Sequence, residues 1–506
     1  MTAATARPSR SLVLSGGGIR VAYQAGAIRA LFDAGLTFDH VDATSGGGLN
    51  LAMLLSGLSP AEMCERWRTL DPKRFLSFMP LEKYLNAADL TAMGGADGIA
   101  SGVIPHLGID FATIRGNRTL AGTFNVCNFT RKANEVVPHG AVDRDVLIAG
   151  MSLPGVLPPV KRGSDWYLDS AFIRDANPLE AVHRGADEVW IIWCLGNTPS
   201  YKGGFLNVYI QMIEMAAHGA LHQDFERIRE LNERVAHGEA PGGRMQPVVV
   251  HLVLPEYRLP LDLDLVTGRI GIATLIDMGY ADASRYLAGR RPEGVPLTPE
   301  VTMMKEGALG LMFRETMSGP FALGVTDPQE GARQGRSAGT ELAMHATITI
   351  RDLTAFIADR EHAGEIVGRI TFPPLGRDLP ASSGRFNLFS PSDDPKLKRM
   401  VYELAFEHGG ESYYLAGRKD VKDDPGFDLW KDTTTLLTRL HKGPDASGPV
   451  VGAGVLSLSP TELVKLLSTA HALNASSVAE EAKAVAAFGR FFLGELWNSY
   501  ISKVTG

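Results

Sequence analysis

Short apolar runs alternate with longer segments of helical periodicity in the first part of the chain. Leu12–Leu14 is an apolar run typical of a buried strand, and Val21–Ala34 has apolar residues at helical spacing. His40–Ala43 is a second short strand, and a further apolar helix begins near Leu49. Glycine-rich turns separate the strands from the helices. The predicted order is strand, turn, helix, strand, turn, helix.

The alternation continues to about residue 290. Leu206–Val235 is predicted as a pair of packed core helices rather than a membrane anchor, and Leu275–Ala283 as a closing helix. Further strands are predicted at Thr119–Asn128, Trp166–Asp169, Glu188–Leu195 and Pro247–Leu254. Glu188–Leu195 is almost wholly apolar, as strands covered on both faces of a parallel sheet are. The pattern predicts an α/β fold, a three-layer core with a mainly parallel sheet.

A different pattern follows the Pro/Gly-rich linker at Arg290–Pro299. Short alternating runs separated by Asp, Pro and Gly predict an antiparallel sheet closed as a barrel or stacked as a sandwich. Its strands are predicted at Leu342–Ile350, Gly364–Phe372, Gly384–Phe389, Arg399–His408 and Ser412–Arg418. Helices are predicted at Asp352–Asp359, Pro460–His471 and Ser477–Trp497. The expected domains are residues 10–295 and a β-rich accessory domain at 300–506, itself a candidate for lipid binding or for a structural or dimerising role.

Composition and charge narrow the class of protein. The 506 residues carry a net charge of −7 without a basic block, which argues against nucleic-acid binding and strong attraction to anionic membranes. Cys64, Cys127 and Cys194 lie far apart and form no metal or redox motif, so no metal or cofactor is expected. The polar start of the chain lacks a signal sequence, and no run has the length of a transmembrane helix. A cytoplasmic protein with at most peripheral membrane contact is expected.

The second glycine-rich turn carries a candidate nucleophile. Ala43-Thr44-Ser45-Gly46-Gly47 is the G-x-S-x-G pattern with alanine in the first position, between a predicted strand and a predicted helix. Small neighbours allow a tight turn there that exposes the Ser45 hydroxyl. A serine in such a turn is also a common helix cap, which is the alternative interpretation.

The first glycine-rich turn has what a serine nucleophile also needs. Gly16-Gly17-Gly18-Ile19-Arg20 places backbone N–H groups at a helix start, where they can hold an oxyanion. Arg20 could add positive charge or brace the loop. A phosphate-binding turn is the alternative, although the spacing fits neither G-x-G-x-x-G nor G-x-x-x-x-G-K-[ST].

A third motif lies far along the chain. Asp169-Ser170-Ala171 ends a strand and leads through Asn177-Pro178-Leu179-Glu180-Ala181 into a helix. With these three motifs in this order, residues 10 to about 290 resemble the patatin-like phospholipases. That family has a G-G-G-x-R/K-G loop, a G-x-S-x-G elbow and a D-G-G/A motif. Here Val21, Ala43 and Ser170 stand where the family has glycine, which leaves the catalytic efficiency open.

The resemblance implies a catalytic pair without histidine. Ser45 would be the nucleophile and Asp169 its base, with the loop from Gly16 to Arg20 as oxyanion hole. The chain's thirteen histidines leave a Ser-His-Asp triad as an alternative, with His183 and His251 nearest to predicted elements, but no histidine stands in a motif.

Two further segments carry weaker expectations. Asp71–Ile109 is apolar but rich in glycine, and either covers the site as a mobile, lipid-contacting lid or packs on the core. The C-terminal half resembles an accessory region of bacterial sterol-oxidase-like proteins and lipid-hydrolase fusions. The matching stretches are Phe313–Gly319, Phe372–Gly376 and Leu429–Leu436.

The resulting hypothesis is a bacterial-type serine hydrolase of lipid carboxylic esters, of the phospholipase A or esterase type. The alternative is a non-catalytic lipid-binding or scaffold protein that keeps the fold. The partner would be a lipid or ester, with transient contact to a membrane surface. Which lipid, which bond and which oligomeric state are left open by the sequence.

Overall fold

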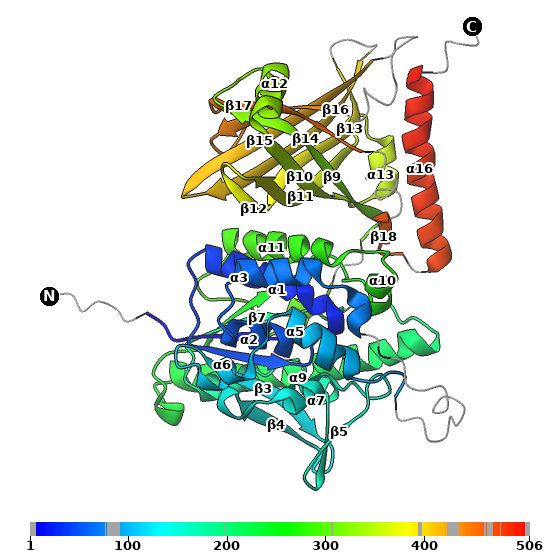
Figure 1. Ribbon diagram of the computed structural model, residues 1–506. Helices are drawn as coiled ribbons and strands as arrows, with labels where there is room; N and C mark the ends of the chain where they lie inside the picture. Colours follow the sequence, from blue (N-terminus) through cyan, green and yellow to red (C-terminus); the bar gives the residue numbers. More distant parts are fainter. Residues whose placement is uncertain are drawn as a thin grey trace, which may run out of the picture. The chain divides into compact units, whose positions relative to one another are not determined.

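The chain divides into two compact units in the computed structural model (Figure 1). One unit comprises Met1–Thr267 and Met278–Lys305, and the other Gly268–Asp277 and Glu306–Gly506. The structure describes residues 7–75, 77, 92–197, 199–304, 307–392, 397–422, 435–459, 462, 469–475 and 477–500. Each unit is considered by itself.

The first unit is built on an eight-stranded, mainly parallel sheet. Its parallel strands run in the order β3, β2, β1, β7, β8. Their bounds are Arg10–Leu14 for β1, His40–Thr44 for β2, Ala121–Asn128 for β3, Glu188–Ile192 for β7 and Val249–Val253 for β8. Antiparallel β4 (Ala133–Pro138), β6 (Asp165–Leu168) and β5 (Val160–Arg162) extend the β3 side. The prediction of a mainly parallel α/β core is confirmed.

Helices cover both faces of this sheet. Val189 and Ile191 of β7 pack against Leu221 and Phe225 of α9 (Phe205–Ala236). The intervening Trp190 faces the other way, and its ring lies 6.0 Å from that of Tyr286 in α11 (Ile272–Ala288). Because side chains alternate along a strand, α9 and α11 lie on opposite faces of the sheet.

The remaining helices of the first unit follow the strands along the chain. They are α1 (Ala22–Asp33), α2 (Gly47–Leu55), α3 (Pro60–Thr69), α5 (Ile104–His106), α6 (Phe111–Gly116), α7 (Arg144–Met151), α8 (Pro178–His183) and α10 (Asp262–Val266). Single turns are η1 (Gly18–Val21), η2 (Pro72–Phe75), η4 (Ile99–Val103), η5 (His139–Ala141), η6 (Ser170–Phe172), η7 (Pro241–Gly243) and η8 (Pro299–Thr302).

The predicted helix pair at Leu206–Val235 is wrong. This segment lies in the single 32-residue helix α9. Gly219 lies inside this helix, is exposed and contacts no neighbouring element, so it does not interrupt the helix. None of the described helices is long and apolar enough to cross a membrane.

The glycine-rich segment Asp71–Ile109 is described only in part. Phe75 stacks on the buried Trp67, and Ile99 is buried, as core packing requires. Met93 is instead exposed. Leu76, Phe78 and Met79, which carry much of the expectation of a lid, lie outside the described residues.

The second unit contains a closed barrel of eight antiparallel strands in the order β9, β10, β11, β13, β14, β15, β16, β17, with β17 pairing back to β9. The bounds are Gly310–Leu323 for β9, Glu341–Ile350 for β10, Ala363–Phe372 for β11, Ser383–Pro391 for β13, Leu397–His408 for β14, Glu411–Lys422 for β15, Thr435–Lys442 for β16 and Val450–Ser457 for β17. Two short strands add to it, β12 (Gly376–Ala381) on β11 and β18 (His471–Leu473) on β9. The predicted β-rich fold is confirmed.

The barrel interior is filled with side chains. Phe313, Phe386 and Tyr402 form a chain of ring contacts, and Phe488 of α16 (Val478–Tyr500) packs on Phe313. Helices α12 (Pro328–Ala338) and α13 (Leu353–Ala358) complete the unit. The helix predicted at Pro460–His471 and the stretch Leu429–Leu436 fall largely outside the described residues, and the resemblance of this half to sterol-oxidase-like proteins stays a prediction.

Candidate active site

Ser45 occupies a strained turn between a strand and a helix. It follows β2 directly, and with φ 54° it is one of few residues other than glycine with positive φ. A side chain at Gly46 would come within 2.4 Å of the Gly18 carbonyl oxygen, and one at Gly47 within 2.6 Å of that of Ser15. Only glycine therefore lets the two glycine-rich turns approach so closely. The partly exposed Ser45 hydroxyl is held at the carboxyl end of the sheet.

Asp169 is the hydrogen-bond partner of Ser45. The Ser45 hydroxyl donates to Oδ2 of Asp169 at 2.5 Å, and the Ala171 amide donates to Oδ1 at 2.9 Å. Asp169 is only 3% exposed, and burial raises its pKa to about 7, while these two hydrogen bonds act in the opposite direction. The carboxyl group therefore changes protonation state near neutral pH.

The glycine loop offers fewer free amides than its sequence suggests. The Gly16 amide donates to the Asp175 side chain at 3.0 Å, and the Ile19 amide donates to Asp262 at 3.1 Å. The Arg20 amide donates to the Gly17 carbonyl oxygen. Within the described part of the chain, the amides of Gly17 and Gly18 have no acceptor. Of the loop from Gly16 to Arg20, only the amides of Gly17 and Gly18 are therefore available as donors to an oxyanion.

Arg20 braces this loop. Its Nε donates to the Gly17 carbonyl oxygen at 3.0 Å, and lies 4.0 Å from the Asp262 carboxylate. Gly18 has φ 61°, and a side chain there would lie 2.1 Å from Asp262. The turn is thus shaped by contacts from both Arg20 and Asp262.

A second buried carboxyl group, Asp175, lies beside the serine. Its Oδ1 and the Ser45 Cβ are 2.2 and 2.9 Å from the point where a Gly16 Cβ would stand. Burial, and then the charge of Asp169, raise the pKa of Asp175 to about 8, against the effects of the Gly16 amide and Arg20. The pKa of Asp175 thus lies above that of Asp169, and the two buried carboxyl groups titrate as a coupled pair.

The three lost glycines leave the backbone unstrained. Val21 has φ −63°, Ala43 lies inside β2, and Ser170 starts a helical turn. Since none of them needs positive φ, glycine is not required at these positions for its conformational freedom. Ser170 in addition donates a hydrogen bond to Asn134 at 2.5 Å.

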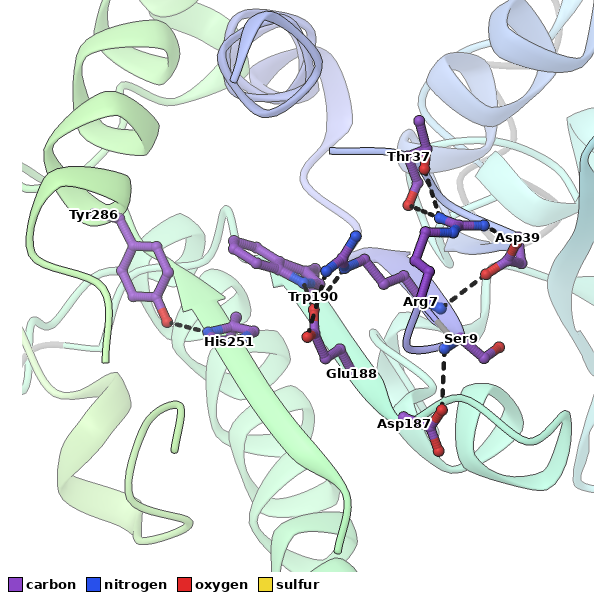
Figure 2. Close-up of polar contacts among 10 residues, drawn as sticks. Arg7, Ser9, Thr37, Asp39, Asp187, Glu188, Trp190, His251 and Tyr286 are labelled. Atoms are coloured by element: carbon purple, nitrogen blue, oxygen red, sulfur yellow. Dashed lines mark hydrogen bonds and ion pairs between the residues drawn. The ribbon is translucent and has the colours of Figure 1, made fainter. Parts of the chain in front are cut away.

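The histidines proposed for a triad lie elsewhere. His251 is buried in β8, stacks on Trp190 and shares a hydrogen bond with Tyr286, as Figure 2 shows. His183 is exposed at the end of α8. All thirteen histidines belong to the described residues, and none of them is a hydrogen-bond partner of Ser45.

Several residues of this site were not predicted from the sequence. Asp175, Asp262, Asn125 and Asn134 all contact the loops around Ser45 and Asp169, although none stands in a motif. The Arg174-Asp175-Ala176-Asn177 run beside the third motif was the only available signal. Among the described residues, no group of three His, Cys, Asp or Glu could hold a metal ion.

Comparisons with known proteins find relatives for part of the chain. The patatin-like phospholipase family model matches residues 12–183. Lysophospholipase NTE1 of Phaeosphaeria nodorum is 27% identical over 317 residues, which are 59% of this chain and 19% of that protein. The chain thus spans about a fifth of the length of this relative.

Two solved structures are distant matches. VipD from Legionella pneumophila (13% identity, 56% of this chain, 67% of that chain) has a TM-score of 0.33. The type III effector ExoU (14% identity, 56% of this chain, 53% of that chain) has a TM-score of 0.24. Such scores add nothing to the assignment of the fold. The family match confirms the predicted resemblance over residues 12–183, the part of the first unit that matches the patatin-like phospholipase model.

Proposed function

We propose that this chain hydrolyses carboxylic esters of lipids, with Ser45 as nucleophile and Asp169 as base. The observation that carries the proposal is the 2.5 Å hydrogen bond from the Ser45 hydroxyl to the buried Asp169 carboxylate. The match of residues 12–183 to patatin-like phospholipases supports a lipid substrate. The relative named lysophospholipase points in the same direction.

Acylation begins with proton transfer. Asp169 removes the hydroxyl proton as Ser45 Oγ attacks the ester carbonyl carbon, because a serine hydroxyl is a poor nucleophile until a base takes its proton. The carbonyl oxygen becomes an oxyanion that accepts hydrogen bonds from the amides of Gly17 and Gly18. The tetrahedral intermediate collapses to an acyl-serine, and protonated Asp169 returns the proton to the departing alcohol.

Deacylation repeats these steps with water. Asp169 takes a proton from the water molecule that attacks the acyl-serine, and the second tetrahedral intermediate releases a fatty acid. The proton returns to Ser45 Oγ. A base with pKa about 7 suits this cycle, since it is substantially ionised at neutral pH and is also basic enough to accept a proton.

A covalent probe tests the proposal. We expect a fluorophosphonate ester to label Ser45, as located by mass spectrometry, and p-nitrophenyl esters of increasing chain length to give the acyl preference. Ser45→Ala and Asp169→Asn should abolish turnover. Ser337→Ala, which removes an exposed hydroxyl from α12, should not change it.

The rival function makes the opposite prediction. If folded wild-type protein shows neither labelling nor turnover, the dyad proposal is wrong and the chain is a lipid-binding or scaffold protein. Binding of a fluorescent fatty acid or phospholipid, unchanged in Ser45→Ala, would then identify that role.

A further inference from the structure

A buried amide joins the strand of the nucleophile to the loop of the aspartate. Asn125 of β3 is 1% exposed. Its Nδ2 donates to Asp42 at 2.7 Å and to the Ala43 carbonyl oxygen at 3.1 Å. Its Oδ1 accepts from Asn134 at 2.8 Å and from Asn177 at 2.9 Å. All hydrogen-bonding positions of the amide are therefore used.

The network reaches the residues next to both members of the dyad. Ala43 lies in β2, two residues before Ser45. On the other side, Asn134 Oδ1 accepts from the hydroxyl of Ser170, which directly follows Asp169. A continuous path of hydrogen bonds thus runs from the Ala43 carbonyl oxygen in β2, through the side chains of Asn125 and Asn134, to Ser170 in the turn of Asp169.

Asn177 anchors the far end of the same loop. Its Oδ1 accepts from the Glu180 amide at the start of α8, while its Nδ2 donates to Asn125. The loop from Asp169 to Asn177 is therefore attached to β3 at two points, directly at Asn177 and through Asn134 at Ser170. Asn125 Oδ1 accepts from both asparagines, while Asn134 is also held by the pairing of β4 with β3.

We propose that Ser170, held through Asn134 by Asn125, is a positioning residue that fixes Asp169 against Ser45. The inference rests on the dyad proposed above. Proton transfer requires Asp169 to stay within hydrogen-bonding distance of Ser45, and displacements of about 1 Å can lower a catalytic rate about 100-fold. The resembled family has glycine at this position, so the hydroxyl is a support added in this chain.

Restoring the glycine provides the sharpest test. We expect Ser170→Gly and Ser170→Ala to lower kcat for a p-nitrophenyl ester about tenfold or more, with KM unchanged, since neither touches the substrate. The hydrogen bond from Ser45 lowers the pKa of Asp169, so a misplaced Asp169 should also move the acid limb of the pH profile upward. A merely structural role would not move this limb.

Two controls separate positioning from loss of stability. Ser11→Ala removes another buried serine hydroxyl from the same sheet, where it contacts His40, and should leave kcat unchanged. Asn134→Ala should reproduce the effect of Ser170→Ala. The double variant should be no slower than either single variant, because both changes break the same path. Thermal unfolding shows that each variant is folded.

The outcomes distinguish the two proposals. If wild-type turnover depends on Ser45 and Ser170→Gly keeps the wild-type kcat and pH profile, the positioning role is overturned while the hydrolase assignment stands. The same holds if the effects of Ser170→Ala and Asn134→Ala simply multiply. If turnover does not depend on Ser45, both proposals fall together.

Discussion

Two carboxyl groups with different proton affinities share the site. Burial raises the pKa of Asp169 to about 7 and that of Asp175 to about 8. Asp169 must be ionised to act as base. Ionisation of Asp175 would add a negative charge beside Ser45, where the substrate oxyanion also forms, and like charges oppose each other.

The pH profile should therefore be bell-shaped. We expect kcat/KM to rise as Asp169 ionises near pH 7 and to fall as Asp175 ionises near pH 8. Asp175→Asn keeps an acceptor for the Gly16 amide but cannot ionise. Steady-state rates between pH 5 and 10 should show that this variant keeps the acid limb and loses the alkaline limb. An unchanged alkaline limb would assign it to another group.

The same residue should affect stability in a pH-dependent way. The folded-state pKa of Asp175, about 8, lies above that of an unfolded aspartate, about 3.9. The folded state thus binds the proton more tightly, and the wild type loses this stabilisation as the pH rises from about 4 to about 8. The difference in melting temperature, Asp175→Asn minus wild type, should increase between pH 5 and pH 8 in thermal unfolding. A constant difference would contradict a buried, protonated Asp175.

At the scale of elements, the first turns of α9 carry exposed apolar side chains close to the site of Ser45 and Asp169. Phe205 and Met215 are 90% and 72% exposed, and Leu206 and Met212 are about half exposed. Tyr209 in the same turns contacts Phe172, three residues after Asp169. Burial, and then the charge of Asp169, raise the pKa of Tyr209 to about 12. Exposed apolar groups in such a place suit contact with a lipid surface.

Hydrolysis of aggregated and dissolved substrates should therefore respond differently to changes in α9. Phe205→Ser and Met215→Ser should each lower activity on phosphatidylcholine vesicles about tenfold or more, because burying a Phe or Met side chain in an apolar phase contributes at least about 1.5 kcal/mol. Hydrolysis of p-nitrophenyl butyrate should not change. The matched control is Met245→Ser, because Met245 lies before β8 and is also 70% exposed; this change should leave both activities unaltered. Equal losses on both substrates would instead indicate damage to the site.

Elements defined by local pattern were predictable from the sequence. The apolar runs at Leu12–Leu14 and Glu188–Leu195 and the glycine turns give the parallel core, because such signals lie within a few residues. The barrel was predicted only in outline. Strand β9 was not predicted. Arg314 and Thr316 interrupt its apolar residues, and those residues are buried only because β9 pairs with β10 and with β17, which lies more than 120 residues later.

The candidate site shows the same division. Ser45 and Asp169 stand in motifs, so the sequence could propose them as a pair. Two features of the site could not be predicted: the Gly16 amide donates to Asp175 and so is not free for an oxyanion, and Asn125 and Asn134 link the two turns. These contacts join residues between 9 and 159 positions apart, and only the folded chain brings them together.

At the scale of whole units, the barrel interior contains two buried ionisable groups of opposite type. Glu315 and Lys419 are 3% and 2% exposed, and Oε1 of Glu315 has no hydrogen-bond partner. Burial raises the pKa of Glu315 and lowers that of Lys419, while each charge opposes the shift of the other. Removing one charge would leave the other buried without compensation.

The effects of single substitutions in the barrel should therefore not add in the double variant. Glu315→Leu and Lys419→Met should each lower the free energy of unfolding by about 3 kcal/mol, whereas the double variant should approach the wild type. Urea unfolding of the three variants measures this coupling. Additive losses in the double variant would show that the two charges do not compensate each other.

Because the barrel is closed, it cannot bind a partner in the way that an open sheet can. Each of its eight strands has a hydrogen-bonded neighbour on both sides, from β9 round to β17. An open sheet can recruit an extended peptide, or a second copy of itself, onto the unpaired backbone of an edge strand. Within the described part of the chain, the wall of eight strands lacks that template. A partner of this unit must therefore be recognised by side chains of its outer surface or by its loops, and aggregation through strand addition to the wall is suppressed by the topology itself.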